Sequence, residues 1–165
     1  MKNSLKIRTY ILSIFILMYT SCSNIASDYN SKGVKKHNIG DYEAAIYYYD
    51  KAIFFNDEYK EAFRNRGGAK LRTQDYKGAL EDLEKAIKYG YLDAFIYNDL
   101  GLVKAELGMY NEAIEDYDLA IIYDNYFSIA FLNRGSAKQK INDIKGACLD
   151  WEKSYSLGLY DANDF

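Results

Sequence analysis

Apolar residues recur at helical spacing along almost the whole chain, and short polar breaks separate the apolar stretches. Spacings of three and four residues between apolar positions predict amphipathic helices, and the breaks contain turn-prone residues such as Gly40-Asp41 and Asn142-Asp143. The pattern predicts eight helices in four pairs. The first helices cover residues 27–39, 60–73, 94–107 and 128–141, and the second helices cover 42–55, 76–89, 110–123 and 144–157.

Three chemically different sets of residues repeat along the chain with one common spacing of 34. They are glycines, alanines and aromatic residues: Gly33, Gly67, Gly101, Gly135; Ala45, Ala79, Ala113, Ala147; Tyr29, Phe63, Tyr97, Phe131. A gapless period of this length indicates one supersecondary unit copied four times and stacked as a solenoid. The predicted units are residues 26–59, 60–93, 94–127 and 128–161.

The repeated glycines fall inside predicted helices, where glycine costs about 1 kcal/mol relative to alanine. Four such positions in one register imply a compensating contact. We expect the two helices of each pair to cross so closely that no larger side chain fits, with the repeated alanines on the facing helix. Large side chains one turn beyond these alanines should fill the core: Tyr49, Leu83, Tyr117 and Trp151.

Two pairs of segments show how similar the units are. GVKKHNIGDYEAAIYYYDKAI (33–53) matches GLVKAELGMYNEAIEDYDLAI (101–121), and AFRNRGGAK (62–70) matches AFLNRGSAK (130–138). Over residues 26–161 the chain resembles the tetratricopeptide repeat, a helix-turn-helix unit of 34 residues. The resemblance implies an all-α, right-handed superhelical solenoid of four repeats. The proline that often closes this repeat is missing, since the chain contains none.

Residues 1–21 have the features of a secretory leader. Lys2, Lys6 and Arg8 precede an apolar stretch over 10–19, which is short for a membrane span of roughly 20 residues. Small residues then precede Cys22, an arrangement that resembles a bacterial lipoprotein signal with lipidation at Cys22. Tyr19 departs from that pattern, and a simple cleaved signal or an uncleaved anchor are the alternatives.

This leader predicts a place in the bacterial cell envelope, anchored to the membrane by lipid, with residues 22–28 as a short tether. Ser23 stands where an aspartate would resemble an inner-membrane retention signal, which weakly favours the outer membrane. Without the lipid, the protein is expected to be periplasmic or secreted.

Charge and composition narrow the class of function. Without residues 1–21 the chain has 18 basic and 24 acidic side chains and a net charge of −6, a poor match for nucleic acid, whose binding depends on neutralised phosphates. His37 is the one histidine, and the two cysteines lack zinc-ligand spacing. No nucleophile elbow or phosphate-binding glycine loop is present. We therefore expect no enzyme activity, no metal and no cofactor.

Two further expectations concern titratable and thiol side chains. The acidic pairs Asp57-Glu58, Glu81-Asp82 and Glu115-Asp116 are expected on solvated helix faces. Cys148 shares the register of Ile46, Leu80 and Ile114, and is therefore expected to be a small buried apolar side chain.

The resemblance also implies a binding surface, because in this family the first helices line a concave groove that holds a partner protein or peptide. The side chains assigned to the groove are Arg64, Phe95, Asn98, Leu102, Ile129 and Leu132, with His37, Leu71 and Arg72 among their neighbours. Some members capture the C-termini of chaperones with lysines, asparagines and arginine. Phe95, Asp99 and Ile129 stand in those registers here, so we do not expect that activity.

The last residues begin a fifth unit, since Phe165 follows Phe131 by 34 positions. Residues 162–165 are thus the start of an incomplete C-terminal cap. Either the chain is truncated or another subunit covers helix 144–157, because solenoids need their ends capped. The main hypothesis is a non-enzymatic, membrane-tethered protein-interaction scaffold. The alternative is a structural subunit that self-associates through its uncapped terminal repeat.

Overall fold

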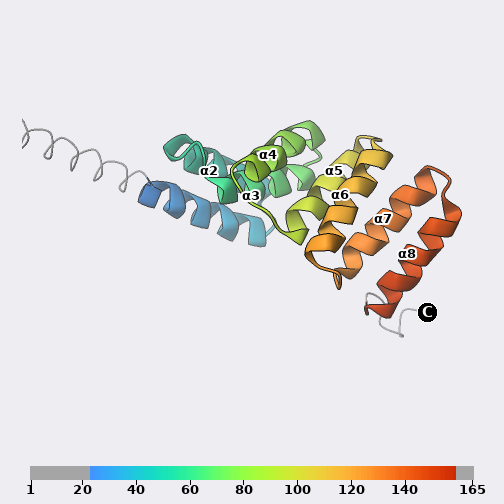
Figure 1. The fold of residues 1–165 in the computed structure, drawn as a ribbon. Coiled ribbons are helices and arrows are strands. Elements are labelled where there is room, and N and C mark those ends of the chain that lie inside the picture. Colours follow the sequence, from blue (N-terminus) through green and yellow to red (C-terminus); the bar gives the residue numbers. More distant parts are fainter. Residues whose placement is uncertain (1–22, 159–165) are drawn as a thin grey trace, which may run out of the picture.

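The computed structural model describes residues 23–158, and this part of the chain forms eight helices and no strand. The helices form a row of stacked pairs (Figure 1), in which each of the labelled helices contacts the next. The first helix covers residues 23–38, and the others follow as α2 (Tyr42–Phe55), α3 (Lys60–Arg72), α4 (Tyr76–Lys88), α5 (Ala94–Glu106), α6 (Tyr110–Tyr123), α7 (Ser128–Lys140) and α8 (Ile144–Ser156). The predicted all-α solenoid of four helix pairs is confirmed.

The N-terminal end differs from the prediction. The first helix was expected to begin at residue 27, after a short tether over 22–28, but it already includes residue 23, and Ala26 is fully buried. The apolar pattern did not predict this first turn, because residues 23–28 are mostly polar and the exposed side of a helix needs no apolar residues. The leader, Cys22 and the start of the cap at 162–165 lie outside the described residues.

The turn inside each helix pair has a residue with a left-handed backbone, and these residues are again 34 positions apart. Their φ angles are 78°, 64°, 78° and 65° at Gly40, Gln74, Gly108 and Asn142. In three of the four pairs the next residue is an aspartate whose carboxylate accepts a hydrogen bond from the first turn of the following helix. Such N-caps typically contribute about 1 kcal/mol each.

The mid-helix glycines are explained by close contact between the paired helices. A Cβ atom on Gly67 would lie 2.9 Å from Cγ of Leu83 and 3.3 Å from the carbonyl oxygen of Ala79. The same holds in the other repeats, where the nearest ring atoms would be 2.5 Å away in Tyr49, 2.7 Å in Tyr117 and 2.6 Å in Trp151. The four facing alanines are fully buried. The prediction that glycine and alanine allow a close crossing is confirmed.

Two ion-pair networks, each centred on a buried aspartate, join neighbouring repeats and are related by a spacing of 68 residues. Arg66 on α3 donates two hydrogen bonds to Asp82 on α4, at 2.8 and 2.6 Å, and a third to Asp50 on α2 at 2.5 Å. Lys70 approaches the same Asp82 carboxylate at 2.8 Å. The side chains of Arg134, Asp150, Asp118 and Lys138 repeat this arrangement across α6, α7 and α8.

The expectation that the acidic pairs are solvated is wrong for Asp82 and Asp116, whereas Glu81 and Glu115 are exposed as expected. Asp82 is 1% exposed and Asp116 is 6% exposed, and Asp116 forms an ion pair of 2.6 Å with Lys104. Asp57 and Glu58 are exposed, as expected. Spacing along the sequence correctly places Asp82 and Asp116 on helices. It does not show their basic partners, because these lie on the adjacent helix.

Cys148 is also a correction, because it is exposed rather than buried. Residues in its register on α2, α4 and α6 are partly covered, since each of those helices is followed by the first helix of the next repeat. Within the described residues, nothing packs against that side of α8. No helix among residues 23–158 is long and apolar enough to cross a membrane.

Candidate functional site

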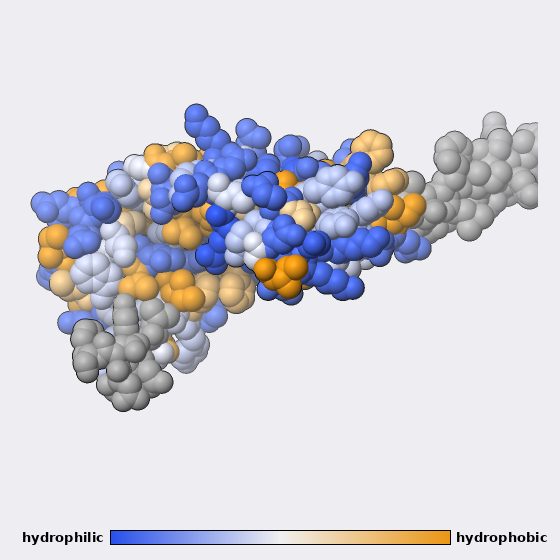
Figure 2. All heavy atoms as spheres, turned by 180° about the vertical axis from the view of Figure 1, so that it is seen from behind, coloured by the Kyte–Doolittle hydropathy of each residue, from blue (hydrophilic) through white to orange (hydrophobic). Residues whose placement is uncertain are grey.

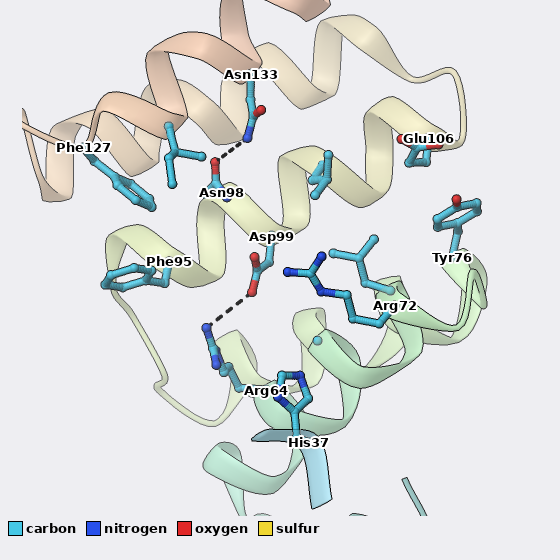
Figure 3. Close-up of a pocket in the computed structure, with 14 residues that line it drawn as sticks. His37, Arg64, Arg72, Tyr76, Phe95, Asn98, Asp99, Glu106, Phe127 and Asn133 are labelled. Atoms are coloured by element: carbon cyan, nitrogen blue, oxygen red, sulfur yellow. Dashed lines mark hydrogen bonds and ion pairs between the residues drawn. The ribbon is translucent and has the colours of Figure 1, made fainter. Parts of the chain in front are cut away.

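A groove of about 540 Å³ runs across the first helices of all four repeats. α3 contacts α5 and α5 contacts α7, so side chains on these helices face a common space (Figure 3). The lining residues come from the first helix, α3, α5 and α7, together with residues at the starts of α4 and α7: His37, Arg64, Gly68, Leu71, Arg72, Tyr76, Phe95, Asn98, Asp99, Leu102, Glu106, Phe127, Ile129 and Asn133.

One end of the groove is aromatic and exposed. The rings of Phe95 and Phe127 lie 4.9 Å apart between centroids at an angle of 58°. Phe95 is 55% exposed and Ile129 beside it is 44% exposed. Burying such rings against a partner is strongly favourable, since each aromatic side chain covers 150–250 Å² in an interface. This end is therefore suited to an apolar side chain.

The middle of the groove is charged. Nη2 of Arg64 lies 3.4 Å from Oδ2 of Asp99, and Figure 3 shows the Arg72 side chain extending towards the same carboxylate. Burial raises the pKa of Asp99, while the charges of Arg64 and Arg72 act in the opposite direction. Arg72 is exposed and forms no ion pair with a described residue.

His37 approaches the groove from the first helix, where its ring makes an edge contact with Tyr42 at 5.1 Å between centroids. Burial lowers the pKa of His37, and the positive charges of Arg72 and Arg64 lower it further. The imidazole is therefore neutral at pH 7 and can both donate and accept a hydrogen bond. The described residues contain no group of three or more His, Cys, Asp or Glu that could hold a metal ion.

Asparagine pairs link the first helices beneath the groove. Nδ2 of Asn133 donates to Oδ1 of Asn98 at 2.9 Å, and Nδ2 of Asn65 donates to Oδ1 of Asn30 at 3.1 Å. Asn98 is only 7% exposed. Its carbonyl oxygen connects α5 to α7.

The structure brings most of the sequence-derived groove residues together. Arg64, Phe95, Asn98, Leu102 and Ile129 all line the groove, whereas Leu132 does not. Their role in binding stays a prediction. Sequence reasoning missed the contributions of Phe127, Tyr76 and Glu106. Phe127 and Tyr76 stand at helix starts, outside the registers from which groove residues were chosen, and an aromatic residue beside a turn was the available signal.

Comparisons with known proteins agree with the fold. The sequence model described as "Tetratricopeptide repeat" matches residues 96–125, and no curated protein matches the chain. Among solved structures, MamA 41-end from Desulfovibrio magneticus RS-1 is 25% identical with a TM-score of 0.75, covering 80% of this chain and 75% of that one.

Two further solved structures show the same fold at lower identity. The Arabidopsis OM64 TPR domain is 20% identical with a TM-score of 0.69, covering 72% of this chain and 98% of that one. The first TPR of Spaghetti (RPAP3), bound to HSP90 peptide SRMEEVD, is 22% identical with a TM-score of 0.70, covering 73% and 95%. With four helix pairs and close glycine–alanine crossings, residues 23–158 have the all-α solenoid fold of these structural neighbours, and residues 96–125 match the tetratricopeptide repeat itself.

Proposed function

We propose that this protein is a non-enzymatic scaffold that binds a segment of a partner protein in the groove. The observation that carries the proposal is the exposed Phe95 side chain, in contact with the half-buried Phe127 ring, inside a concave surface built by four helices. Exposed apolar side chains gathered in a concavity usually mark a contact site. A structurally similar domain, the first TPR of Spaghetti, is bound to a peptide, which supports the same mode of use here.

The two regions of the groove define the segment that it would accept. An apolar side chain of the partner packs against Phe95 and Ile129, and a carboxylate or backbone carbonyl oxygen accepts from Arg72. Asp99 makes the centre unsuitable for a second carboxylate, since two like charges at close range repel. The preferred segment therefore has an apolar anchor and one acidic or carbonyl group at the arginine.

Paired aromatic substitutions test this proposal. Phe95 in the groove and Phe54 on α2 are both exposed, at 55% and 80%, and each ring contacts a second phenylalanine ring, at 4.9 and 5.3 Å. With the purified chain as bait in an extract of its own cells, Phe95→Ala should lose most of the captured partner while Phe54→Ala retains it. Equal capture by both variants, at equal melting temperatures, would exclude the groove as the binding site.

We further propose that a lipid on Cys22 holds the scaffold at the bacterial cell envelope, with the outer membrane weakly favoured. The support is the leader pattern in the sequence, which lies outside the described residues. Tethering would raise the effective concentration of the groove near a membrane-bound partner. Labelling cells with a fatty acid should mark the protein and fail to mark Cys22→Ala. Persistent label in that variant would show that the lipid is not on Cys22.

A second candidate function is self-association through the last repeat. The observation that favours it is the exposure of apolar side chains on α8, where Ile144 is 51% exposed and Tyr155 is 55% exposed. Light scattering of the purified chain at high micromolar concentration should then report more than one copy per particle. A stable monomer at that concentration would remove this candidate.

A further inference from the structure

The outer side of α8 differs from the matching side of the three earlier second helices. The residues that correspond to Ile144 in the earlier repeats are tyrosines at 42, 76 and 110, and all three are partly covered. Those that correspond to Tyr155 are isoleucines at 53, 87 and 121, and they are partly covered as well. On α8, Ile144, Cys148 and Tyr155 are all exposed. These three residues form one side of the helix, called here the α8 face. Its apolar character is that of a repeat-to-repeat contact.

The opposite end of the solenoid does not complement the α8 face. Asp28 and Lys35 on the first helix are exposed. In their registers the later repeats place side chains that are buried between repeats: Ala62, Ile96 and Ala130 for Asp28, and Ala69, Val103 and Ala137 for Lys35. Stacking the first helix of one copy on α8 of another would bury two charged groups against apolar side chains, which is strongly unfavourable. Head-to-tail assembly is therefore excluded on charge.

Exposed apolar residues elsewhere stand in registers that the repeats leave open. Phe54 and Ile122 share one register, and Lys88 and Ser156 are exposed at the same position of the other two repeats. Figure 2 shows separate hydrophobic patches bordered by hydrophilic ones on the side that it presents. The α8 face is distinguished because its residues occupy registers that the same chain covers three times.

We propose that the α8 face packs against the α8 face of a second copy, with the two helices antiparallel. This proposal rests on the self-association proposed above and specifies its geometry. A two-fold contact uses the same surface on both copies, so it does not need the polar N-terminal end. Antiparallel helices also bring opposite ends of their dipoles together.

Charges beside the face select the antiparallel arrangement. Lys145 and Glu152 are both exposed and stand seven residues apart, so they share one edge of the helix. In a parallel two-fold pair, this edge would lie beside the opposite edge of the partner helix, where Ala147 and Ser154 are buried, so neither charge would meet an opposite charge. In an antiparallel pair Lys145 of one copy meets Glu152 of the second copy, twice per dimer. The edge is self-complementary in this orientation alone.

The same pairing fixes the position of the two-fold axis. The midpoint between residues 145 and 152 falls between Cys148 and Leu149, and Cys148 is the one of these two that belongs to the α8 face. The axis therefore passes close to Cys148, and the two Cys148 thiols lie beside one another across the dimer. One helix face is small compared with the 1,200–2,000 Å² of a stable interface, so we expect a weak and reversible dimer.

Thiol cross-linking of the full chain, purified in a mild detergent, tests the geometry. Cys22→Ser leaves Cys148 as the one thiol, and a short homobifunctional maleimide should then link two copies. The matched control adds Cys148→Ser and Leu149→Cys, which moves the thiol to a neighbouring exposed position directed away from the face. Efficient linking at 148 and little at 149 is expected, and equal linking at both positions would overturn the proposal.

Charge reversal provides the second arm. Lys145→Glu or Glu152→Lys alone turns two attractive contacts into repulsive ones and should weaken dimerisation about tenfold. The double variant restores attraction and should regain the linking of the parent. Single variants that dimerise as well as the parent would refute the antiparallel pairing. A dimer by light scattering without linking at 148 would leave self-association intact and reject this geometry. A monomer in which maleimide does not modify Cys148 would show instead that residues after α8 cover the face.

Discussion

Adjacent glycines in α3 provide a direct test of why this chain keeps glycine inside its helices. A Cβ atom on Gly67 would approach Cγ of Leu83 to 2.9 Å and Cδ2 to 3.0 Å, and Leu83 is fully buried. A Cβ atom on Gly68 would meet nothing within 4 Å. Gly67→Ala and Gly68→Ala therefore make the same chemical change on the same helix with opposite packing consequences.

The expected magnitudes follow from two terms. Replacing glycine by alanine inside a helix gains about 1 kcal/mol in both variants, so Gly68→Ala should stabilise the chain by up to that amount. Gly67→Ala carries the additional cost of overpacking, about 1–3 kcal/mol, because both Leu83 and the α4 backbone at Ala79 would have to move. The helix term cancels in the difference, which should be about 1–3 kcal/mol in favour of Gly68→Ala.

Urea unfolding of the purified chains, followed by helical circular dichroism, measures this difference. The two free energies of unfolding can be compared only if the slope of free energy against urea is the same in both variants. This slope is checked because repeat proteins can lose cooperativity when they unfold. A Gly67→Ala variant as stable as Gly68→Ala would refute the close-crossing explanation. A Gly67→Ala variant that is unfolded before urea is added would agree with it, provided that Gly68→Ala is folded.

Two further outcomes are expected from charged and titratable groups. Arg134→Met should lower the free energy of unfolding by about 2 kcal/mol. This is less than the about 3–5 kcal/mol expected when a buried ion loses its only partner, because Lys138 still lies 2.8 Å from Asp150. An unchanged urea midpoint would contradict this prediction. Stability should fall as the pH drops below about 6.5, because the unfolded chain binds a proton at His37 while its lowered pKa keeps the folded imidazole neutral. His37→Gln should reduce this fall between pH 7.5 and 5.5, and an identical pH profile in the variant would show that His37 is not responsible.

Much of the fold followed from local pattern. Apolar periodicity and turn residues place helix boundaries within the chain because both act over a few residues. The 34-residue spacing of Gly67 and Ala79 with their counterparts also predicted the close crossing, since only a contact between helices explains glycine at those positions. The apolar pattern did not predict that the first helix includes residue 23, because the residues at this end are mostly polar.

The sequence by itself determined the repeat and the helix pairs, because these depend on periodicity within one unit. Only the tertiary structure decided which acidic residues are buried: Asp82 and Asp116 are paired by Arg66 and Lys104 on neighbouring helices. It also decided that Phe127 joins Phe95 in the groove and that Cys148 is exposed. These outcomes depend on which helix lies next to each residue in space, and the environment of a side chain at the end of a stack differs from that of its counterparts within it.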